Sequence, residues 1–523
     1  MTDKFKGLIE SASLNRRQFS TMAAAGAAVS SIGTMAMPAL ADTPKRGGRL
    51  RFGWTSSGAD DTMNPELMTS ANDYLRSYLN YNMLVRYAPD GSAMPDLAES
   101  WEVNDDATEW VFTLRDGVEF HNGKTLTADD VIYSLNLHRG DDTASAIKGY
   151  LEPVVELTAD GPRKVRVKLS GSNADFATLL GQPQAAIVPD GYTDFANAIG
   201  TGPFKQVRFE PGLGYLGERN ENYFLEGKPY YDEVEVIGIE DTQARINALL
   251  TGDVNYVNRV GAQSSRIIDR SPNTTLVSVP SKRVLGFPMM IDREPTNNLD
   301  LRLAIRNLIK RESMLNDIHK GFGVLGNDVP VAPFEQYYNS DLPQREFDLD
   351  KAKFHLKKAG MENATIDLDT SLAVDATAPD MALHLKESAA EAGLTINITR
   401  RPTDGYWSSV WLSTPFNMVT WNPRPTPDAI LTIAYMSDAK WNENGLNFED
   451  MDKLIVEARG TVDGPARAEL YHEVQRILWE RGGSALPVFT NWLDGHSANM
   501  RGHSANPTGE GDSYRIAEYS WFA

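Results

Sequence analysis

Strand-like and helix-like hydrophobic patterns alternate along residues 365–420, and this alternation narrows the folds that the chain can adopt. The expected order is strand, helix, strand, helix and strand, over residues 365–373, 379–392, 394–400, 404–412 and 416–420. Strands joined through crossover helices lie parallel in one sheet, because each helix returns the chain to the edge where it started. The sequence therefore predicts an α/β fold.

The loop after the last of these strands reads Trp-Asn-Pro-Arg-Pro-Thr-Pro over residues 421–427. Ligands of open parallel sheets bind beyond the carboxyl ends of the strands, so this loop is a candidate binding element. Trp421 offers a flat aromatic face, and Arg424 offers a guanidinium group near Asn422. The alternative is an ordinary proline-rich surface loop, in which Trp421 is half buried and Arg424 bonds its own loop.

The chain has 523 residues, a formal net charge of −20 and no cysteine. This length is enough for two or three domains. The acidic balance disfavours nucleic acid and anionic membranes as partners and favours a freely diffusing protein, which we expect to be a monomer. The absence of cysteine excludes disulfides, thiolate metal sites and a cysteine nucleophile.

Residues 1–41 have the pattern of an export signal. Arg16 and Arg17 precede an apolar run of small residues, and the run ends with Ala39 and Ala41 where a signal peptidase needs small side chains. Paired arginines followed by Phe19 resemble a twin-arginine signal, although Asn15 stands where Ser or Thr is usual. We therefore expect cleavage after Ala41 and a periplasmic mature protein.

A set of short motifs follows in a fixed order along the rest of the chain. They are Pro-Asp-Leu-Ala-Glu-Ser-Trp at 95–101, Gly-Val-Glu-Phe-His-Asn-Gly at 117–123, Leu-Thr-Ala-Asp-Asp-Val at 126–131, Gly-Thr-Gly-Pro-Phe-Lys at 200–205 and Glu-Arg-Asn-Glu-Asn-Tyr-Phe at 218–224. Together they resemble the signature of the family 5 extracellular solute-binding proteins, the dipeptide-, oligopeptide- and nickel-binding group of ABC importers. The resemblance extends over essentially the whole mature chain.

This resemblance implies a two-lobed periplasmic binding protein with an extra subdomain on lobe I (type II, cluster C-like). Lobe I is expected over residues 42–284, with the added subdomain near 85–199, lobe II over 285–488, and a return to lobe I over 489–523. Such lobes close around a small organic ligand, and the closed form docks on ABC permease subunits at the inner membrane. The resemblance implies neither catalysis nor a cofactor.

The loop at 421–427 departs from the family in one position. Peptide-binding members carry Trp-x-x-Asp there, and the Asp pairs with the free amine of the ligand. Trp421 matches the Trp, but Arg424 stands in place of the Asp. A ligand amine facing Arg424 would be repelled, so an anion or a neutral acceptor is expected, as in modified peptides, opines or sugar conjugates. Some dipeptide binders also carry an Arg after the first strand of this unit, whereas residues 371–374 carry no charge.

Further candidates for the wall of the binding site are aromatic or small polar residues near strand ends. They are Tyr406, Trp407 and Trp441 from the second lobe, and Trp54, Thr55 and Ser56 from the first. Aromatic walls with few polar anchors suit a sizeable organic molecule.

Other patterns in the sequence favour no different function. G-x-G-x-x-G occurs at 212–217 and 321–326, but neither stretch is expected between a strand and a helix, as a dinucleotide site requires. His496 and His503 are predicted to be exposed loop residues and not metal ligands. The alternatives that stay open are plain di- or oligopeptide import, a sensor or chaperone without transport, and a periplasmic enzyme, for which no catalytic motif is found.

Overall fold

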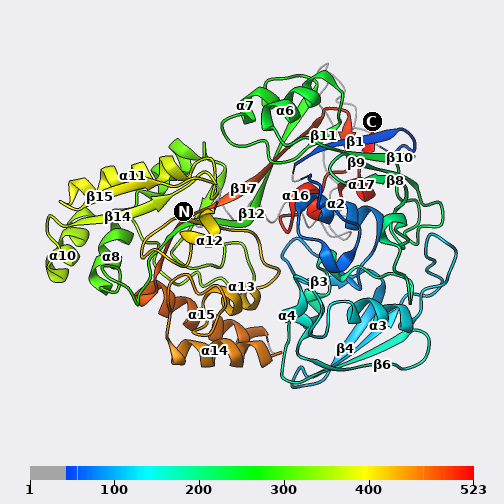
Figure 1. Cartoon of the computed structure of the whole chain (residues 1–523), viewed down its shortest axis with the longest axis horizontal. Helices are drawn as coiled ribbons and strands as arrows, with labels where there is room; N and C mark the ends of the chain where they lie inside the picture. The colour runs from blue at the N-terminus through cyan, green and yellow to red at the C-terminus, as the bar shows by residue number, and fades with distance from the viewer. Residues whose placement is uncertain (1–42, 56, 404, 463) are drawn as a thin grey trace, which may run out of the picture. The chain divides into compact units, whose positions relative to one another are not determined.

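A computed structural model describes residues 43–523 apart from 56, 404 and 463 (Figure 1). The expected export signal, with Arg16, Arg17, Ala39 and Ala41, lies outside the described residues, as does Ser56. Within the described part of the chain, no helix has the length and apolar character needed to cross a membrane. The elements below all belong to the unit formed by residues 44–523.

The largest sheet has nine strands in the order β16-β12-β17-β11-β1-β10-β9-β8, with β13 paired to β17. β1 lies parallel to β10 and β11, and the other pairs are antiparallel. The strands are β1 (Arg49–Trp54), β8 (Phe204–Glu210), β9 (Gly214–Arg219), β10 (Glu233–Gly238), β11 (Tyr256–Val257), β12 (Thr274–Pro288), β13 (Gly323–Leu325), β16 (Val419–Trp421) and β17 (Ser484–Ser497).

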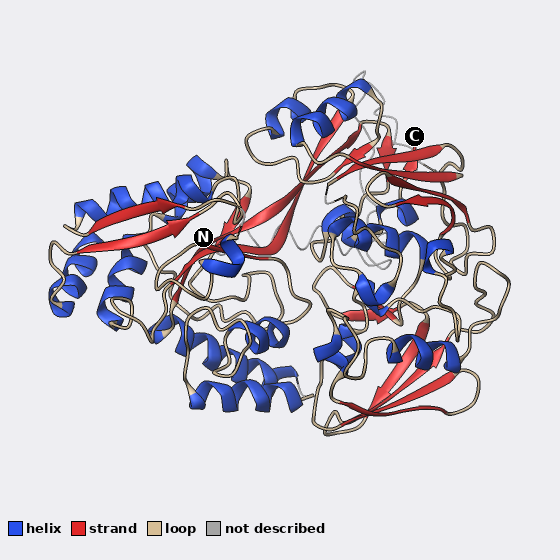
Figure 2. Cartoon of the chain, viewed as in Figure 1, coloured by secondary structure: helices blue, strands red, loops and turns tan. Residues whose placement is uncertain are grey.

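β12 and β17 are the two long strands that run side by side through Figure 2. They contribute to several hydrophobic cores: Leu285 and Val488 pack with residues of 301–418, whereas Leu276 and Leu493 pack with residues of 246–268. The register shifts between Pro280 and Val284. Such an irregularity turns side chains away from the regular alternation, and here it reorients the residues between these two positions.

A second sheet has four antiparallel strands in the order β4-β5-β7-β6 and forms its own core with α3. These elements are β4 (Ala98–Val103), β5 (Glu109–Leu114), β6 (Val154–Ala159), β7 (Lys164–Leu169) and α3 (Ala128–Asn136). α3 begins after Thr127, which forms a capping box with Asp130 and satisfies main-chain N–H groups of the first turn. A short hairpin, β2 (Val85–Tyr87) with β3 (Ala93–Pro95), precedes this sheet.

The α/β unit expected over residues 365–420 is only partly confirmed. β14 (Thr365–Thr370), α11 (Ala378–Glu391) and β15 (Thr395–Arg400) follow the prediction, and the two strands are parallel. The third strand was wrongly placed: β16 pairs antiparallel with β12, and only one parallel bridge, Asp369 to Asn417, links this segment to β14. β12 has an edge at this point whose main-chain groups need partners, and β16 supplies them.

Residues 299–481 also contain several longer helices. They include α8 (Leu299–Leu308), α10 (Leu349–Ala359), α13 (Pro427–Ala434), α14 (Glu449–Gly460) and α15 (Gly464–Arg481). The helix expected at 404–412 is reduced to one turn, α12 (Tyr406–Ser409), which is too short to act as a crossover helix.

Two sequence patterns have clear positions in this fold. The glycine stretch at 212–217 covers the turn of the β8–β9 hairpin, and the stretch at 321–326 contains β13, so neither opens a helix after a strand. The prediction for His496 was wrong: it lies in β17, is buried, and stacks on Tyr256 with ring centres 6.4 Å apart. The last residues of β17 pair with both β11 and β12.

Residues 172–175, just after β7, contact the α14–α15 pair. Ala174 N–H donates to the carbonyl of Arg459 at 2.8 Å, and Arg467 Nη1 donates to Asp175 at 2.8 Å. The side chains of Arg467 and Asp175 are only 5% and 10% exposed. A buried ion pair therefore joins two segments that are far apart in the sequence.

Arg467→Ala should lower the free energy of unfolding by about 3 kcal/mol or more, because it leaves the Asp175 carboxylate buried without its partner. Arg476→Ala on the same helix is the control: Arg476 forms exposed pairs with Glu473 and Glu480, so its loss should cost no more than about 1 kcal/mol. Denaturant unfolding of both variants measures the difference. Equal losses would show that the buried pair contributes no more than a surface pair.

Candidate functional site

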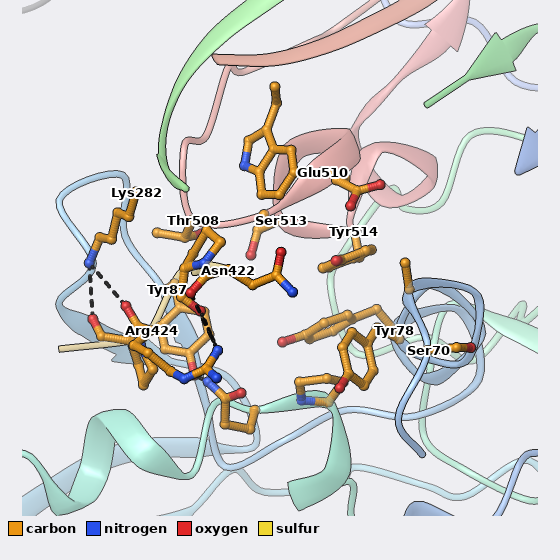
Figure 3. A pocket seen from close by; sticks show the side chains of 18 of the residues that line it. Ser70, Tyr78, Tyr87, Lys282, Asn422, Arg424, Thr508, Glu510, Ser513 and Tyr514 are labelled. Carbon is orange, nitrogen blue, oxygen red and sulfur yellow. Dashed lines mark hydrogen bonds between the residues drawn. The ribbon is translucent and has the colours of Figure 1, made fainter. Parts of the chain in front are cut away.

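Two cavities meet at the loop that follows β16. One, of about 340 Å³, is called here the tyrosine cavity because Tyr74, Tyr78, Tyr87 and Tyr514 line it (Figure 3). The other, of about 810 Å³, is called the tryptophan cavity because its lining includes Trp407, Trp411, Trp421 and Trp441. Four residues line both cavities: Arg259, Asn422, Arg424 and Trp492.

The tryptophan side chains form one continuous aromatic wall. Trp411 lies at its centre, with its ring 5.6 Å from that of Trp407 and 6.0 Å from those of Trp421 and Trp441. The rings of Trp421 and Trp441 are 5.9 Å apart. Offset and edge-on aromatic contacts at these distances are favourable, so the wall is held together by its own packing.

A buried carboxylate lies behind this wall. Glu443 is 1% exposed and accepts hydrogen bonds from the indole N–H groups of Trp411, at 2.9 Å, and Trp421, at 3.0 Å. Burial raises the pKa of Glu443 to about 7, although both hydrogen bonds act in the opposite direction. The two indoles are therefore oriented by one acidic residue.

Arg424 lies over the ring of Trp421, with its guanidinium carbon 5.5 Å from the ring centre. Its Nη1 also donates to the carbonyls of Asn422 and Pro423, both at 3.3 Å. No ion pair joins Arg424 to a carboxylate within residues 43–523 as the structure describes them. Both interpretations of the sequence therefore apply: Arg424 bonds its own loop and also faces both cavities.

Lys282, from the irregular part of β12, anchors the loop that follows β16. Its Nζ donates to the main-chain oxygen of Pro425 at 3.1 Å, as the dashed lines in Figure 3 show, and pairs with Glu335 at 2.8 Å. Both charged side chains are less than a tenth exposed. Gly91 approaches so closely that a Cβ atom there would lie 3.0 Å from Lys282 Nζ. The turn before β3 thus contacts the same loop.

Arg283 brings a second cation from the same part of β12 to the tryptophan cavity. It pairs with Asp375 at 2.8 Å and lies beside the carbonyl of Val374. The sequence had suggested that this region carries no charge, because 371–374 carries none of its own. The Ser-Lys-Arg run inside this strand was the sequence signal that could have placed a charge here.

His319 also lines the tryptophan cavity, and burial lowers its pKa to about 4, so it is neutral at pH 7.

Three of the tyrosines that line the tyrosine cavity, Tyr74, Tyr78 and Tyr87, have hydroxyl groups that are already hydrogen-bonded. Tyr78 stacks on Tyr514 with ring centres 6.0 Å apart, and its hydroxyl donates to the carbonyl of Gly181 at 2.7 Å. The hydroxyl of Tyr87 accepts from Gln182 at 2.6 Å. These bonds fix the rings, so the cavity presents rigid aromatic surfaces.

A run of left-handed backbone forms one side of this cavity. Gly511, Asp512, Ser513 and Tyr514 have φ values of +54°, +56°, +60° and +62°. Each non-glycine residue in this region costs roughly 1–2 kcal/mol, so other contacts must hold the turn in place. The Asp512 carboxylate accepts two main-chain N–H groups, at 2.7 and 3.0 Å. Glu510, just before the turn, pairs with Arg259 at 2.5 Å.

The structure separates the candidate wall residues into two groups. Those that line the cavities are Trp421, Asn422, Arg424, Trp407 and Trp441. Those that line neither cavity are Tyr406, Trp54 and Thr55.

The residues of the second group have partners inside the protein. Tyr406 is 1% exposed, and its hydroxyl donates to the carbonyl of Met418 at 2.8 Å. Trp54 is fully buried beside Phe52 at the end of β1. Thr55 is bonded to Asn258 and Glu240. Sequence reasoning also missed the tyrosines and Glu443, for which no local motif exists.

Comparison with known proteins gives the context for this site. The family model described as bacterial extracellular solute-binding proteins, family 5 Middle, matches residues 92–443. The dipeptide-binding protein of Escherichia coli K12 is 24% identical over 513 residues, which span 87% of this chain and 92% of that protein.

Solved structures show the same fold. DppA from Helicobacter pylori in complex with the peptide STSA has a TM-score of 0.75 at 22% identity and covers 91% of this chain and 98% of its own. AgaA from A. tumefaciens R10 in complex with agropinic acid has a TM-score of 0.75 at 23% identity and covers 91% and 99%. The chain has the mixed α/β fold of the cluster C periplasmic binding proteins, as the sequence resemblance implied.

Lys282→Met should lower the free energy of unfolding by about 3 kcal/mol, because Glu335 stays buried without its cation. Lys440→Met is the matched control, since Lys440 is exposed and its loss should change stability by no more than about 0.5 kcal/mol. Combining Lys282→Met with Glu335→Gln should recover part of the loss. Denaturant unfolding measures all three variants, and a Lys282→Met variant as stable as the control contradicts the anchoring role.

Proposed function

This chain belongs to the bacterial extracellular solute-binding proteins of family 5, and from that premise we propose that it captures an anionic organic ligand for an ABC importer. The members of this family are binding proteins and not enzymes. The proposed ligand is peptide-like, opine-like or a sugar conjugate. It lies between the two lobes and is delivered to permease subunits at the inner membrane.

The position of Arg424 is the observation that carries this proposal. Its guanidinium lies where the two cavities meet, and its only polar acceptors among the described residues are carbonyls of its own loop. Carbonyl groups do not neutralise a full positive charge, so a carboxylate or phosphate of a ligand can pair with it. A free amine at the same place would meet a like charge, which is costly in a partly desolvated cavity.

The two cavities suggest where the different parts of a larger ligand bind. The tryptophan wall offers a wide aromatic surface for the bulk of the molecule, and sugar rings and planar groups both stack on such surfaces. The side chain of Asn422 forms no bond that competes with a ligand in the described structure, and it projects into the tyrosine cavity in Figure 3. Arg424 and Asn422 then bind the polar part of the ligand between the two aromatic regions.

The relatives bind ligands of more than one kind. One solved relative holds agropinic acid and another holds the peptide STSA. The curated relative from Escherichia coli is named as a dipeptide-binding protein. Plain di- or oligopeptide import is therefore the alternative, and a sensor or chaperone that binds ligand without feeding a permease is a further one.

The proposed lobes are 42–284 with 489–523, and 285–488, with the added subdomain near 85–199. Separate hydrophobic cores support this division: one core draws its buried residues from 84–187, and two others draw theirs from 284–489. β12 and β17 cross between the lobes, and closure of the lobes around ligand follows the hinge mechanism of such proteins. The mature protein is proposed to act as a periplasmic monomer after twin-arginine export and cleavage at Ala41.

A thermal-shift screen of the mature protein tests the ligand assignment. The library contains free-amine di- and tripeptides, opines, sugar phosphates and oligosaccharides. An anionic ligand should stabilise the parent by about 2.7 kcal/mol at 100 times its Kd, and Arg424→Asp should abolish the effect. Arg400→Asp, an exposed site at the end of β15, should keep it. If free-amine peptides stabilise the parent best, the protein is a plain peptide importer.

Adjacent residues of α12 provide a second test. Trp407 is 39% exposed and lines the tryptophan cavity, so Trp407→Ala should weaken ligand binding while unfolding changes little. Tyr406→Phe removes a buried hydrogen bond, so it should lower stability by about 1 kcal/mol while affinity stays within twofold. Calorimetry and denaturant unfolding measure the two effects. The reverse pattern of losses contradicts the assignment of the wall.

A further inference from the structure

Glu443 forms hydrogen bonds with three members of the tryptophan wall. Each carboxylate oxygen accepts one indole N–H: Oε2 from Trp411 at 2.9 Å and Oε1 from Trp421 at 3.0 Å. Its main-chain N–H donates to the carbonyl of Trp441 at 2.7 Å. In the described part of the chain, no Lys, Arg or His forms an ion pair with it. Its charge is therefore balanced only by hydrogen bonds.

This arrangement places a negative group at the N–H edge of one indole and a positive group over its ring. The Glu443 carboxylate bonds the N–H edge of Trp421, and the guanidinium of Arg424 lies over the same ring. A carboxylate that accepts an N–H bond polarises the donor and increases the electron density of its ring, which strengthens the attraction for a cation over the face. The orientation of Trp421 and the position of Arg424 are thus coupled.

We propose that Glu443 is a positioning residue, whose ionised carboxylate orients the indoles of Trp411 and Trp421 and thereby holds Arg424 where the two cavities meet. This inference rests on the proposed function, since it takes Arg424 as the group that binds the anionic part of the ligand. It makes ligand affinity depend on a residue that lies behind the wall and does not touch the ligand.

Of the groups described around it, Glu443 is the one whose pKa lies near neutral pH. Its neighbours are the two indoles, the phenols of Tyr406 and Tyr435, whose pKa values burial raises above the ordinary value, and Arg424 across Trp421. Lys440 lies over Trp441 with its Nζ 6.0 Å from the ring centre.

Stability and affinity should therefore respond to pH in opposite directions. The folded-state pKa of Glu443, about 7, lies above its ordinary value of 4.5, so the unfolded chain releases this proton at lower pH than the folded protein does, and stability falls as pH rises between these two values. The folded protein itself ionises around pH 7, which gives each indole a full acceptor, so ligand affinity should rise around that pH, at the upper end of this window. A simple through-space effect of the charge on an anionic ligand has the opposite sign.

Indole ¹⁵N–¹H NMR of the ligand-free mature protein is the first test, because it does not depend on knowing the ligand. The signals of Trp411 and Trp421, assigned with Trp411→Phe and Trp421→Phe, should move together between pH 5.5 and 8 with a midpoint near 7. The side-chain Nε–H signal of Arg424, assigned with Arg424→Asp, should follow the same curve because the Trp421 ring current acts on it. Glu443→Gln should abolish all three movements.

A rescue variant distinguishes positioning from general loss of structure. The amide of Glu443→Gln can accept only one indole N–H and presents a donor to the other, so affinity for any anionic ligand found in the screen should fall at least tenfold. Adding Trp411→Phe removes the unmatched N–H, and the double variant should return to the affinity of Trp411→Phe alone.

The outcomes separate this inference from the proposed function. Unchanged indole titrations in Glu443→Gln, or tighter anion binding by that variant, would overturn the role of Glu443. Loss of ligand in Arg424→Asp with full affinity in Glu443→Gln would leave the proposed function intact and refute this inference. Full affinity in Arg424→Asp refutes the proposed function, whatever the indole signals show.

Discussion

The antiparallel pairing of β12 with β17 is the constraint on which the rest of the site depends. Their ladder satisfies main-chain groups along two long strands, and it holds firmly on both sides of the irregularity between Pro280 and Val284. Because the flanking pairs are fixed, the residues between them are turned in a defined direction. Lys282 thereby reaches the loop after β16, and Arg283 reaches the tryptophan cavity.

Charges near the cavities fall into two kinds. Most cations there have a carboxylate of their own, as Lys282 has in Glu335 and Arg283 has in Asp375, so they hold the structure and offer little to a ligand. Arg424 has only carbonyls and an aromatic face, and Glu443 has only indole N–H groups. These two incompletely neutralised groups both contact Trp421, Glu443 at its N–H edge and Arg424 over its ring. An external anion can balance the charge of Arg424, which pairs with no carboxylate in the described part of the chain.

Local patterns predicted the elements whose contacts are local. The strand-helix-strand unit of β14, α11 and β15 was recovered because hydrophobic periodicity reports which face each segment buries. The pairing of β16 with β12 was not predicted, because β12 lies more than 100 residues away and hydrophobic periodicity does not indicate which strand is the partner. Helix α12 ended early for a related reason: Trp411, a few residues later, turns into the aromatic wall and leaves the helical path.

By itself the sequence determined the family, the α/β fold and the replacement that makes the loop at 421–427 distinctive, because a contiguous motif keeps its meaning without coordinates. Only the tertiary structure decided which side chains face the cavities. Tyr406 and Trp407 are neighbours in the chain, yet one is buried beneath Met418 and the other is exposed to the cavity. The direction in which a side chain points depends on which distant segments pack against each side of its helix or strand. A single sequence contains no record of that packing.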